Sequence, residues 1–160
     1  MSIEYRKAAP DMLALLVRTR IEVLRAANQL DEDADLSEVA AQSRYYYQTA
    51  LADGTHAGYL AFDGPRFVGT GGVSYYRVMP TCHNPTGRKA YIMNMYVRPE
   101  YRRRGIATHI LTLLREDAFA RGIRCITLEA TPAGRPLYEH FGFVAMKNEM
   151  ELPDGEEEHD

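Results

Sequence analysis

The sequence predicts a mixed α/β fold, in which a central and mostly antiparallel sheet carries helices on both faces. The first observation is the order of the segments: runs typical of strands and runs with apolar residues at three- and four-residue spacing alternate as β-α-α-β-β-β-α-β-α-β. The second is the segment 91–97, which is apolar at both alternating sets of positions. A strand of this kind is covered on both faces, so we expect it inside the sheet.

Each element follows from local signals. The expected elements are a strand at 3–8, helices at 10–24 and 36–51, strands at 56–63 and 66–78, the central strand at 91–97, a helix from 103 or 104 to 121, a strand at 125–130, a helix at 132–140, and a final strand or irregular strand pair at 143–152. The turn Asp63-Gly64-Pro65 predicts an antiparallel hairpin. Gly54 and Gly122 stand where helices should end.

Length and composition indicate one domain, residues 1–152, followed by an acidic tail at 153–160 that we expect to be disordered. The net charge of −3 gives no support to nucleic-acid binding. Two cysteines provide no disulfide framework, and we expect both as reduced thiols. Neither a signal core nor a membrane-length apolar run occurs, so we expect a cytoplasmic protein without a membrane partner.

The junction between the central strand and the next helix has the character of an anion site. Three arginines, Arg102, Arg103 and Arg104, precede Gly105 and the small residues Ala107 and Thr108. A helix N-terminus has unpaired N–H groups and a partial positive charge, and a glycine lets an anion approach the backbone. A pyrophosphate fits this description, although three arginines alone more often form a solvated basic face.

Three motifs in the second half of the chain resemble those of the GNAT superfamily of N-acetyltransferases. Arg102-x-x-Gly105-x-Ala107 is similar to the R/Q-x-x-G-x-G/A signature, and Tyr138-Glu139-His140-Phe141-Gly142-Phe143 is similar to the Y-x-x-x-G-F ending. Thr131-x-x-Gly134-x-x-x-Tyr138 falls where the family commonly has N-x-x-A-x-x-x-Y, so it departs at two positions. The predicted order of elements is also that of the family.

This resemblance implies an acetyl-CoA-dependent N-acetyltransferase that uses no metal. It implies that the backbone amides from Arg103 to Thr108, including that of Ile106, hold the pyrophosphate of acetyl-CoA. It also implies that Met95, Tyr96 and Val97 position the thioester, that Thr131 contacts the cofactor, and that Tyr138 contacts the cofactor and protonates the leaving thiolate. The acceptor implied is the primary amine of a small molecule or an amino-acid-like compound.

The residue that accepts the proton from the amine is not evident. Many family members have a glutamate on the central strand, but 91–97 contains no carboxylate, and Asn94 cannot accept a proton. The alternatives are Glu129, His83, His56, or a water chain held by Asn94 and Tyr91. Of these we favour Glu129, and we expect both histidines to be surface residues.

Several other hypotheses remain open or can be set aside. The glycine run 69–72 is followed by a strand pattern, which argues against a dinucleotide loop. Cys82, His83 and Cys125 have the wrong spacing for zinc. The acidic run 31–38 either steers a cationic amine or is a solvated loop. Acetylation of a protein N-terminus or lysine, a non-catalytic acyl-CoA-binding module and a homodimer are left open.

Overall fold

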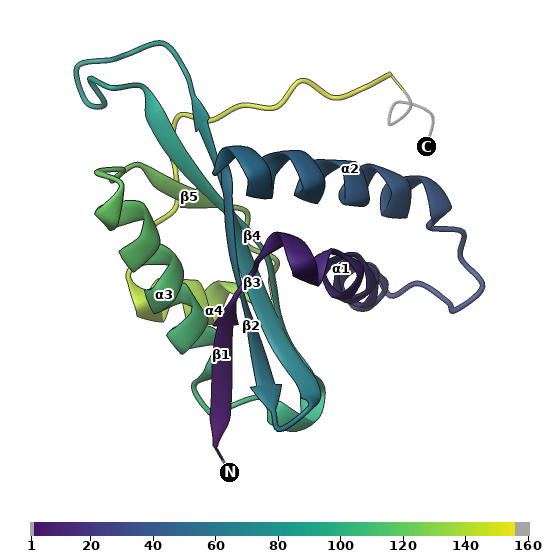
Figure 1. Cartoon of the computed structure of the whole chain (residues 1–160). Helices are drawn as coiled ribbons and strands as arrows, with labels where there is room; N and C mark the ends of the chain where they lie inside the picture. The colour runs from purple at the N-terminus through teal and green to yellow at the C-terminus, as the bar shows by residue number, and fades with distance from the viewer. Residues whose placement is uncertain (1, 156–160) are drawn as a thin grey trace. The chain divides into compact units, whose positions relative to one another are not determined.

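The computed structural model describes residues 2–155 and contains a sheet of five strands in chain order, β1-β2-β3-β4-β5 (Figure 1). Each strand is antiparallel to its neighbours except β5, which runs parallel to β4. The mixed and mostly antiparallel sheet is therefore confirmed. The elements are β1 (Ile3–Lys7), α1 (Leu13–Ala27), α2 (Ser37–Asp53), β2 (His56–Asp63), β3 (Arg66–Arg77), β4 (Arg88–Val97), α3 (Ile106–Ala120), β5 (Ile126–Leu128) and α4 (Arg135–Phe141), with 3-10 turns at Pro10–Met12 and Pro99–Tyr101.

The chain forms two compact units, one ending at Glu129 and one beginning at Ala130. The first holds the whole sheet together with α1, α2 and α3, and the second holds α4. None of the helices within residues 2–155 combines the length and the apolar character needed to span a bilayer.

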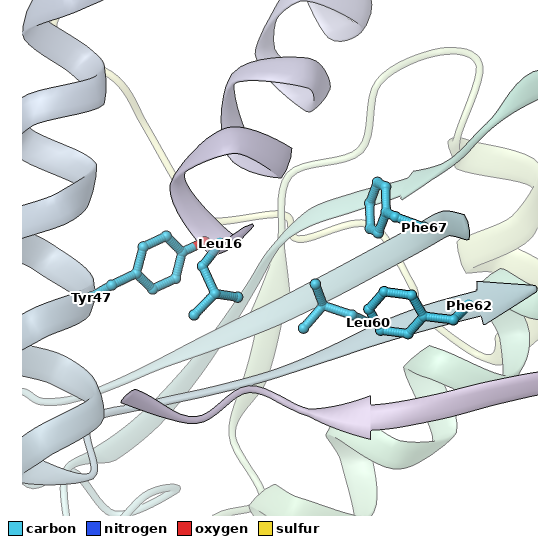
Figure 2. Close-up of a cluster of buried hydrophobic side chains, with 5 residues drawn as sticks. All are labelled: Leu16, Tyr47, Leu60, Phe62 and Phe67. Atoms are coloured by element: carbon cyan, nitrogen blue, oxygen red, sulfur yellow. The ribbon is translucent and has the colours of Figure 1, made fainter. Parts of the chain in front are cut away.

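In the first unit, helices cover both faces of the sheet (Figure 1). On one face, α3 packs through Ile110, Leu111 and Leu114, which are fully buried. On the other face lie α1 and α2. Figure 2 shows the buried cluster that holds them there, formed by Leu16 of α1, Tyr47 of α2, Leu60 and Phe62 of β2, and Phe67 of β3. This cluster fixes α1 and α2 against the strands.

The helix α3 begins later than the sequence predicted. We expected its start near Arg103 or Arg104, but its first residue is Ile106. Arg103 and Gly105 have φ angles of 63° and 80°, which a right-handed helix does not accommodate. These two left-handed residues, which follow the 3-10 turn Pro99–Tyr101, therefore occupy the predicted first turn.

The predicted strand at 143–152 is wrong, because the structure shows neither helix nor strand there. The apolar residues that suggested it include Val144, Met150 and Leu152, and all three are largely exposed. Apolar alternation favours a strand only where a neighbouring edge supplies hydrogen bonds, and none does here within the described residues. Of the tail predicted to be disordered, 153–155 have no regular structure, and 156–160 lie outside the described residues.

Candidate active site

A β-bulge interrupts β4 in the middle of the predicted site. Thr70 of β3 pairs with Tyr96, but Gly72 pairs with Met93, so β4 contains one residue more than β3 between these pairs. Asn94 lies in this bulge with a left-handed φ of 64°. A bulge of this type bends the strand and redirects its side chains, and bulges are frequent beside active sites.

Beyond the bulge, one edge of β4 is open. The strand β5 pairs with β4 only from Ala90 to Ile92, and no other strand within residues 2–155 pairs with β4 on that side. The amide of Arg98 donates to the carbonyl of Val68 in β3 at 2.8 Å. Because successive N–H groups alternate in direction along a strand, we infer that the amides of Val97 and Met95 face the open edge. Two predicted thioester-positioning residues thus offer donors there, whereas the backbone of Tyr96 faces β3.

Glycines of β3 make room for this arrangement. A Cβ on Gly71 would collide with the Sδ of Met95 and lie 2.7 Å from Cγ2 of Ile110, and a Cβ on Gly69 would lie 3.0 Å from the carbonyl oxygen of Tyr96. The glycine run that we excluded as a dinucleotide loop lies wholly within β3. Its role is to let the bulge and α3 approach the sheet closely.

The N-terminus of α3 offers free backbone donors. Within residues 2–155, no side chain caps this helix end, and its first internal donor is the amide of His109, which bonds to the carbonyl of Gly105 at 3.0 Å. The amides of Ile106, Ala107 and Thr108 therefore have no partner inside the helix. An added Cβ on Gly105 would meet nothing within 4 Å, so the space beside this residue is open.

The three arginines differ in their contacts. The Nε atom of Arg102 donates to the carbonyl oxygen of Val97 at 3.0 Å, which ties the turn to the end of β4. The guanidinium of Arg104 lies 5.2 Å from the ring centre of Tyr101. Arg103 is exposed. The contacts of Arg102 and Arg104 thus support the turn, and the backbone amides remain the predicted anion site.

Two predicted residues lie in the second unit. Thr131 accepts a hydrogen bond from the amide of Gly134 through its Oγ1 atom at 3.2 Å, and so shapes the turn before α4. Tyr138 lies in α4, half-buried, with its ring centre 6.0 Å from that of Phe143. Burial raises the pKa of Tyr138 above its ordinary value.

The candidates for the proton acceptor have different surroundings. Glu129 is exposed and directly follows β5, and His83 is exposed in the loop between β3 and β4. Asn94 accepts a hydrogen bond through Oδ1 from the Nη1 atom of Arg20 at 2.9 Å. Among these candidates Glu129 is the carboxylate, and it directly follows β5, the short strand that pairs with β4.

The expectation that His56 lies on the surface is wrong, because its side chain is only 8% exposed. Its Nδ1 atom lies 2.8 Å from the hydroxyl of Tyr46, which in turn lies 2.5 Å from the hydroxyl of Ser74. The absence of side chains on Gly58 and Gly72 leaves room for the ring. Burial, assisted by the charge of Arg121, lowers the pKa of His56 to about 4, so the imidazole is neutral near pH 7.

Sequence reasoning missed Arg20, which contacts the bulge from α1. The signal was present: Arg20 follows Leu16 by four positions and precedes Val23 by three, so it shares their buried stripe. An arginine on such a stripe indicates a specific contact.

No group of three His, Cys, Asp or Glu side chains within residues 2–155 is arranged to hold a metal ion.

Comparison with known proteins identifies the family of this fold. The model of the acetyltransferase (GNAT) family matches residues 21–143. The chain belongs to the GNAT family. No curated protein shows significant sequence similarity to it.

Solved GNAT structures extend the likeness over nearly the whole chain. A predicted acetyltransferase from Clostridium acetobutylicum, crystallised with acetyl-CoA, is 32% identical, with a TM-score of 0.87 and coverage of 99% of this chain and 100% of the other. A GCN5-related N-acetyltransferase from Ralstonia eutropha is 29% identical, with a TM-score of 0.78 and coverage of 96% and 99%. An aminoglycoside acetyltransferase from an uncultured soil metagenomic sample is 22% identical, with a TM-score of 0.70 and coverage of 97% and 100%, a likeness that shows the fold alone.

The chain is thus an acetyl-CoA-dependent N-acetyltransferase of the GNAT family. The residues present fit this cosubstrate. The uncapped end of α3 and the open space at Gly105 suit a diphosphate, and the amides on the open edge of β4 suit a thioester carbonyl.

Proposed function

We propose that this GNAT enzyme acetylates the primary amine of a small-molecule acceptor, which attacks the acetyl group directly. The observation that carries the proposal is the edge of β4 that β5 does not pair, toward which the alternation of the strand directs the amides of Met95 and Val97. Such donors stabilise negative charge that develops on a carbonyl oxygen under attack. Acetyl-CoA supplies the activated acetyl group.

The other residues have separate roles in this proposal. The amides of Ile106, Ala107 and Thr108 bind the diphosphate, and Thr131 supports the turn that leads to α4. Tyr138 provides a proton for the departing thiolate. Glu129 accepts the proton from the amine, directly or through water held by Asn94. His56 is less suited to this step, because a group whose pKa is about 4 is a weak base at neutral pH.

A small-molecule acceptor is favoured by the loop between β3 and β4. The loop is held by its own hydrogen bonds: the amide of Thr81 donates to the carbonyl of Asn84 at 3.1 Å, and the Nδ2 atom of Asn84 donates to the carbonyl of Arg88 at 3.0 Å. An ordered loop before β4 suits a covered pocket better than an open peptide groove. Acetylation of a protein N-terminus or a lysine is the competing hypothesis.

The first experiment tests the cosubstrate site. Acetyl-CoA should raise the melting temperature of the wild type but not that of Gly105→Glu, whose carboxylate would repel the diphosphate and cover the amides. Gly64→Glu is the matched control, because Gly64 also has a positive φ and open space around its Cα but lies in the turn between β2 and β3. Equal stabilisation of Gly105→Glu and wild type would contradict the site.

The second experiment tests the acceptor. We expect thiol release from acetyl-CoA in the presence of amines, amino acids or aminoglycosides, and much slower release with peptides that carry free N-termini or lysines. Faster release with peptides would replace the small-molecule hypothesis by the protein one. Tight binding of acetyl-CoA without release for any acceptor would contradict both.

A further inference from the structure

A positive charge is fixed where β4 opens. Arg20 of α1 extends to the bulge and donates from Nη1 to the Oδ1 atom of Asn94 at 2.9 Å. Leu16, one turn before it, belongs to the buried cluster of Figure 2, and Val23, one turn after it, is also buried. The helix is therefore packed firmly on both sides of Arg20, and the guanidinium is held at the residue next to Met95.

This cation has no anionic partner among residues 2–155. Glu22, on the same helix, is bound by Arg98 through two hydrogen bonds of 2.8 and 2.9 Å. The charged or titratable neighbour that acts on Arg20 is Tyr47, but burial raises the pKa of that hydroxyl to about 12, so it is neutral near pH 7. Burial also lowers the pKa of Arg20. A partly buried cation without a counter-ion is costly, and a bound anion would offset that cost.

The guanidinium of Arg20 has further N–H donors besides the one that contacts Asn94. Arginine carries five N–H groups in a planar fork, and one of them contacts Asn94. The remaining donors match the two oxygens of a carboxylate, which arginine binds with bidentate geometry.

We infer that Arg20 binds the carboxylate of the acceptor, so that the acceptor of this acetyltransferase is an α-amino acid. The inference rests on the function proposed above. In an α-amino acid the amine and the carboxylate are attached to the same carbon. A carboxylate held at Arg20, which contacts Asn94, places the amine beside Met95, whose amide faces the open edge of β4.

The acidic run at 31–38 does not reverse this charge. The carboxylate of Asp35 accepts a hydrogen bond from the amide of Ser37 at 2.9 Å, where α2 begins. Arg25 holds the same loop by donating to the carbonyls of Asp31 and Ala34. The run is therefore tied beyond the C-terminal part of α1, whereas Arg20 contacts β4. A polycationic acceptor would meet a positive charge at the site.

The test compares acceptors that differ only in the carboxylate. Thiol release is measured with the twenty L-amino acids and with two matched sets, L-phenylalanine, L-phenylalaninamide and 2-phenylethylamine, and L-methionine, L-methioninamide and 3-(methylthio)propylamine, together with spermidine and kanamycin. We expect at least one amino acid to be acetylated, and its kcat/KM to exceed those of its amide and of its decarboxylated amine by about 30-fold or more, the loss typical of an unpaired buried charge.

Variants of α1 assign the effect to Arg20. In Arg20→Met the preference for the amino acid should disappear, mainly through KM, so that the amino acid, its amide and its decarboxylated amine react with similar kcat/KM. Arg20→Lys should retain part of the preference, since it keeps the charge but not the fork. Arg18→Met, at an exposed position of the same helix, should behave as wild type. The melting temperature of each variant without ligand shows whether it is folded.

A binding measurement separates this inference from the proposed function. The CoA-bound protein is titrated calorimetrically with L-phenylalanine, L-methionine and their amides. Binding of an amino acid that Arg20→Met abolishes, without acetyl transfer to any acceptor, would support the carboxylate site and refute the proposed activity. Equal transfer to acids, amides and amines, or equal losses for all of them in Arg20→Met, would overturn the carboxylate site alone. The carboxylate site would also be overturned if no amino acid bound and none was acetylated.

Discussion

Replacing Gly71 by alanine should damage both the stability and the cosubstrate site, because the added methyl group has no room. Its Cβ would overlap the Sδ of Met95 and lie 2.7 Å from Cγ2 of Ile110, whereas ordinary contacts begin near 3.4 Å. Ile110 is fully buried and cannot move away. Overpacking of this kind costs about 1–3 kcal/mol. For a chain of this length we expect the melting temperature to fall by roughly 2–12 °C.

The side chain of Met95 is the more adaptable neighbour, so part of the strain should pass to the residue whose amide faces the open edge of β4. We therefore expect weaker acetyl-CoA binding in addition to the lower melting temperature. Both are measured by thermal unfolding with and without acetyl-CoA. Met95→Ala in the Gly71→Ala background should recover only part of the lost stability, because the close contact with Ile110 remains, and Gly155→Ala, where a Cβ meets nothing, should leave stability unchanged. An unaltered melting temperature together with unaltered acetyl-CoA affinity would refute this account of the glycine.

Three further predictions concern ionisable groups. The pKa of His56 is lowered to about 4 in the folded state, so the unfolded chain binds more protons than the folded one below pH 6.5. The free energy of unfolding should therefore fall as the pH drops from 6.5 toward 4. Urea unfolding at several pH values should show a weaker fall for His56→Gln than for the wild type, and an unchanged fall for His83→Gln. Tyr138→Phe should lower kcat by about 10²-fold with unchanged acetyl-CoA binding, as expected for a lost general acid, while Tyr45→Phe, at an exposed position, keeps full turnover; equal rates would exclude Tyr138 from proton transfer. Glu129→Gln should lower kcat to a similar extent if it is the base, and unchanged pH–rate profiles would assign that role elsewhere.

The sequence predicted the sheet and the helix-end signals well, because these depend on local patterns. Alternation and turn residues located the hairpin between β2 and β3, and Gly54 ends α2 in the left-handed conformation as expected. The prediction at 143–152 failed because a strand also needs a partner edge, which no local pattern reports. The start of α3 was placed too early because the left-handed φ of Arg103 is not a property of arginine itself.

The candidate site was predictable in its backbone but less so in its side chains. The Arg102-x-x-Gly105-x-Ala107 motif pointed to the amides of α3, and the family resemblance implied the segment containing Met95. The helix has no side-chain cap at its start, and β5 does not pair with β4 beyond Ile92. The environments of His56 and Arg20 depend on contacts between residues far apart in the sequence. Tyr46 links His56 to Ser74, which is 18 positions away, and Arg20 contacts Asn94, which is 74 positions away. The paired glycines beneath His56 and the arginine on an apolar stripe were the available signals.

Because β5 pairs with only part of β4, the hydrogen exchange of the β4 amides should report whether a ligand occupies the site. The amide of Arg98 is bonded to β3 and should exchange its hydrogen with deuterated solvent slowly, whereas those of Met95 and Val97 face an edge that β5 does not reach and should exchange quickly. Fast and slow amides therefore alternate along a single strand. A ligand carbonyl bound at that edge would slow only the fast set, so the exchange pattern of three residues would distinguish a filled site from a general stiffening of the sheet.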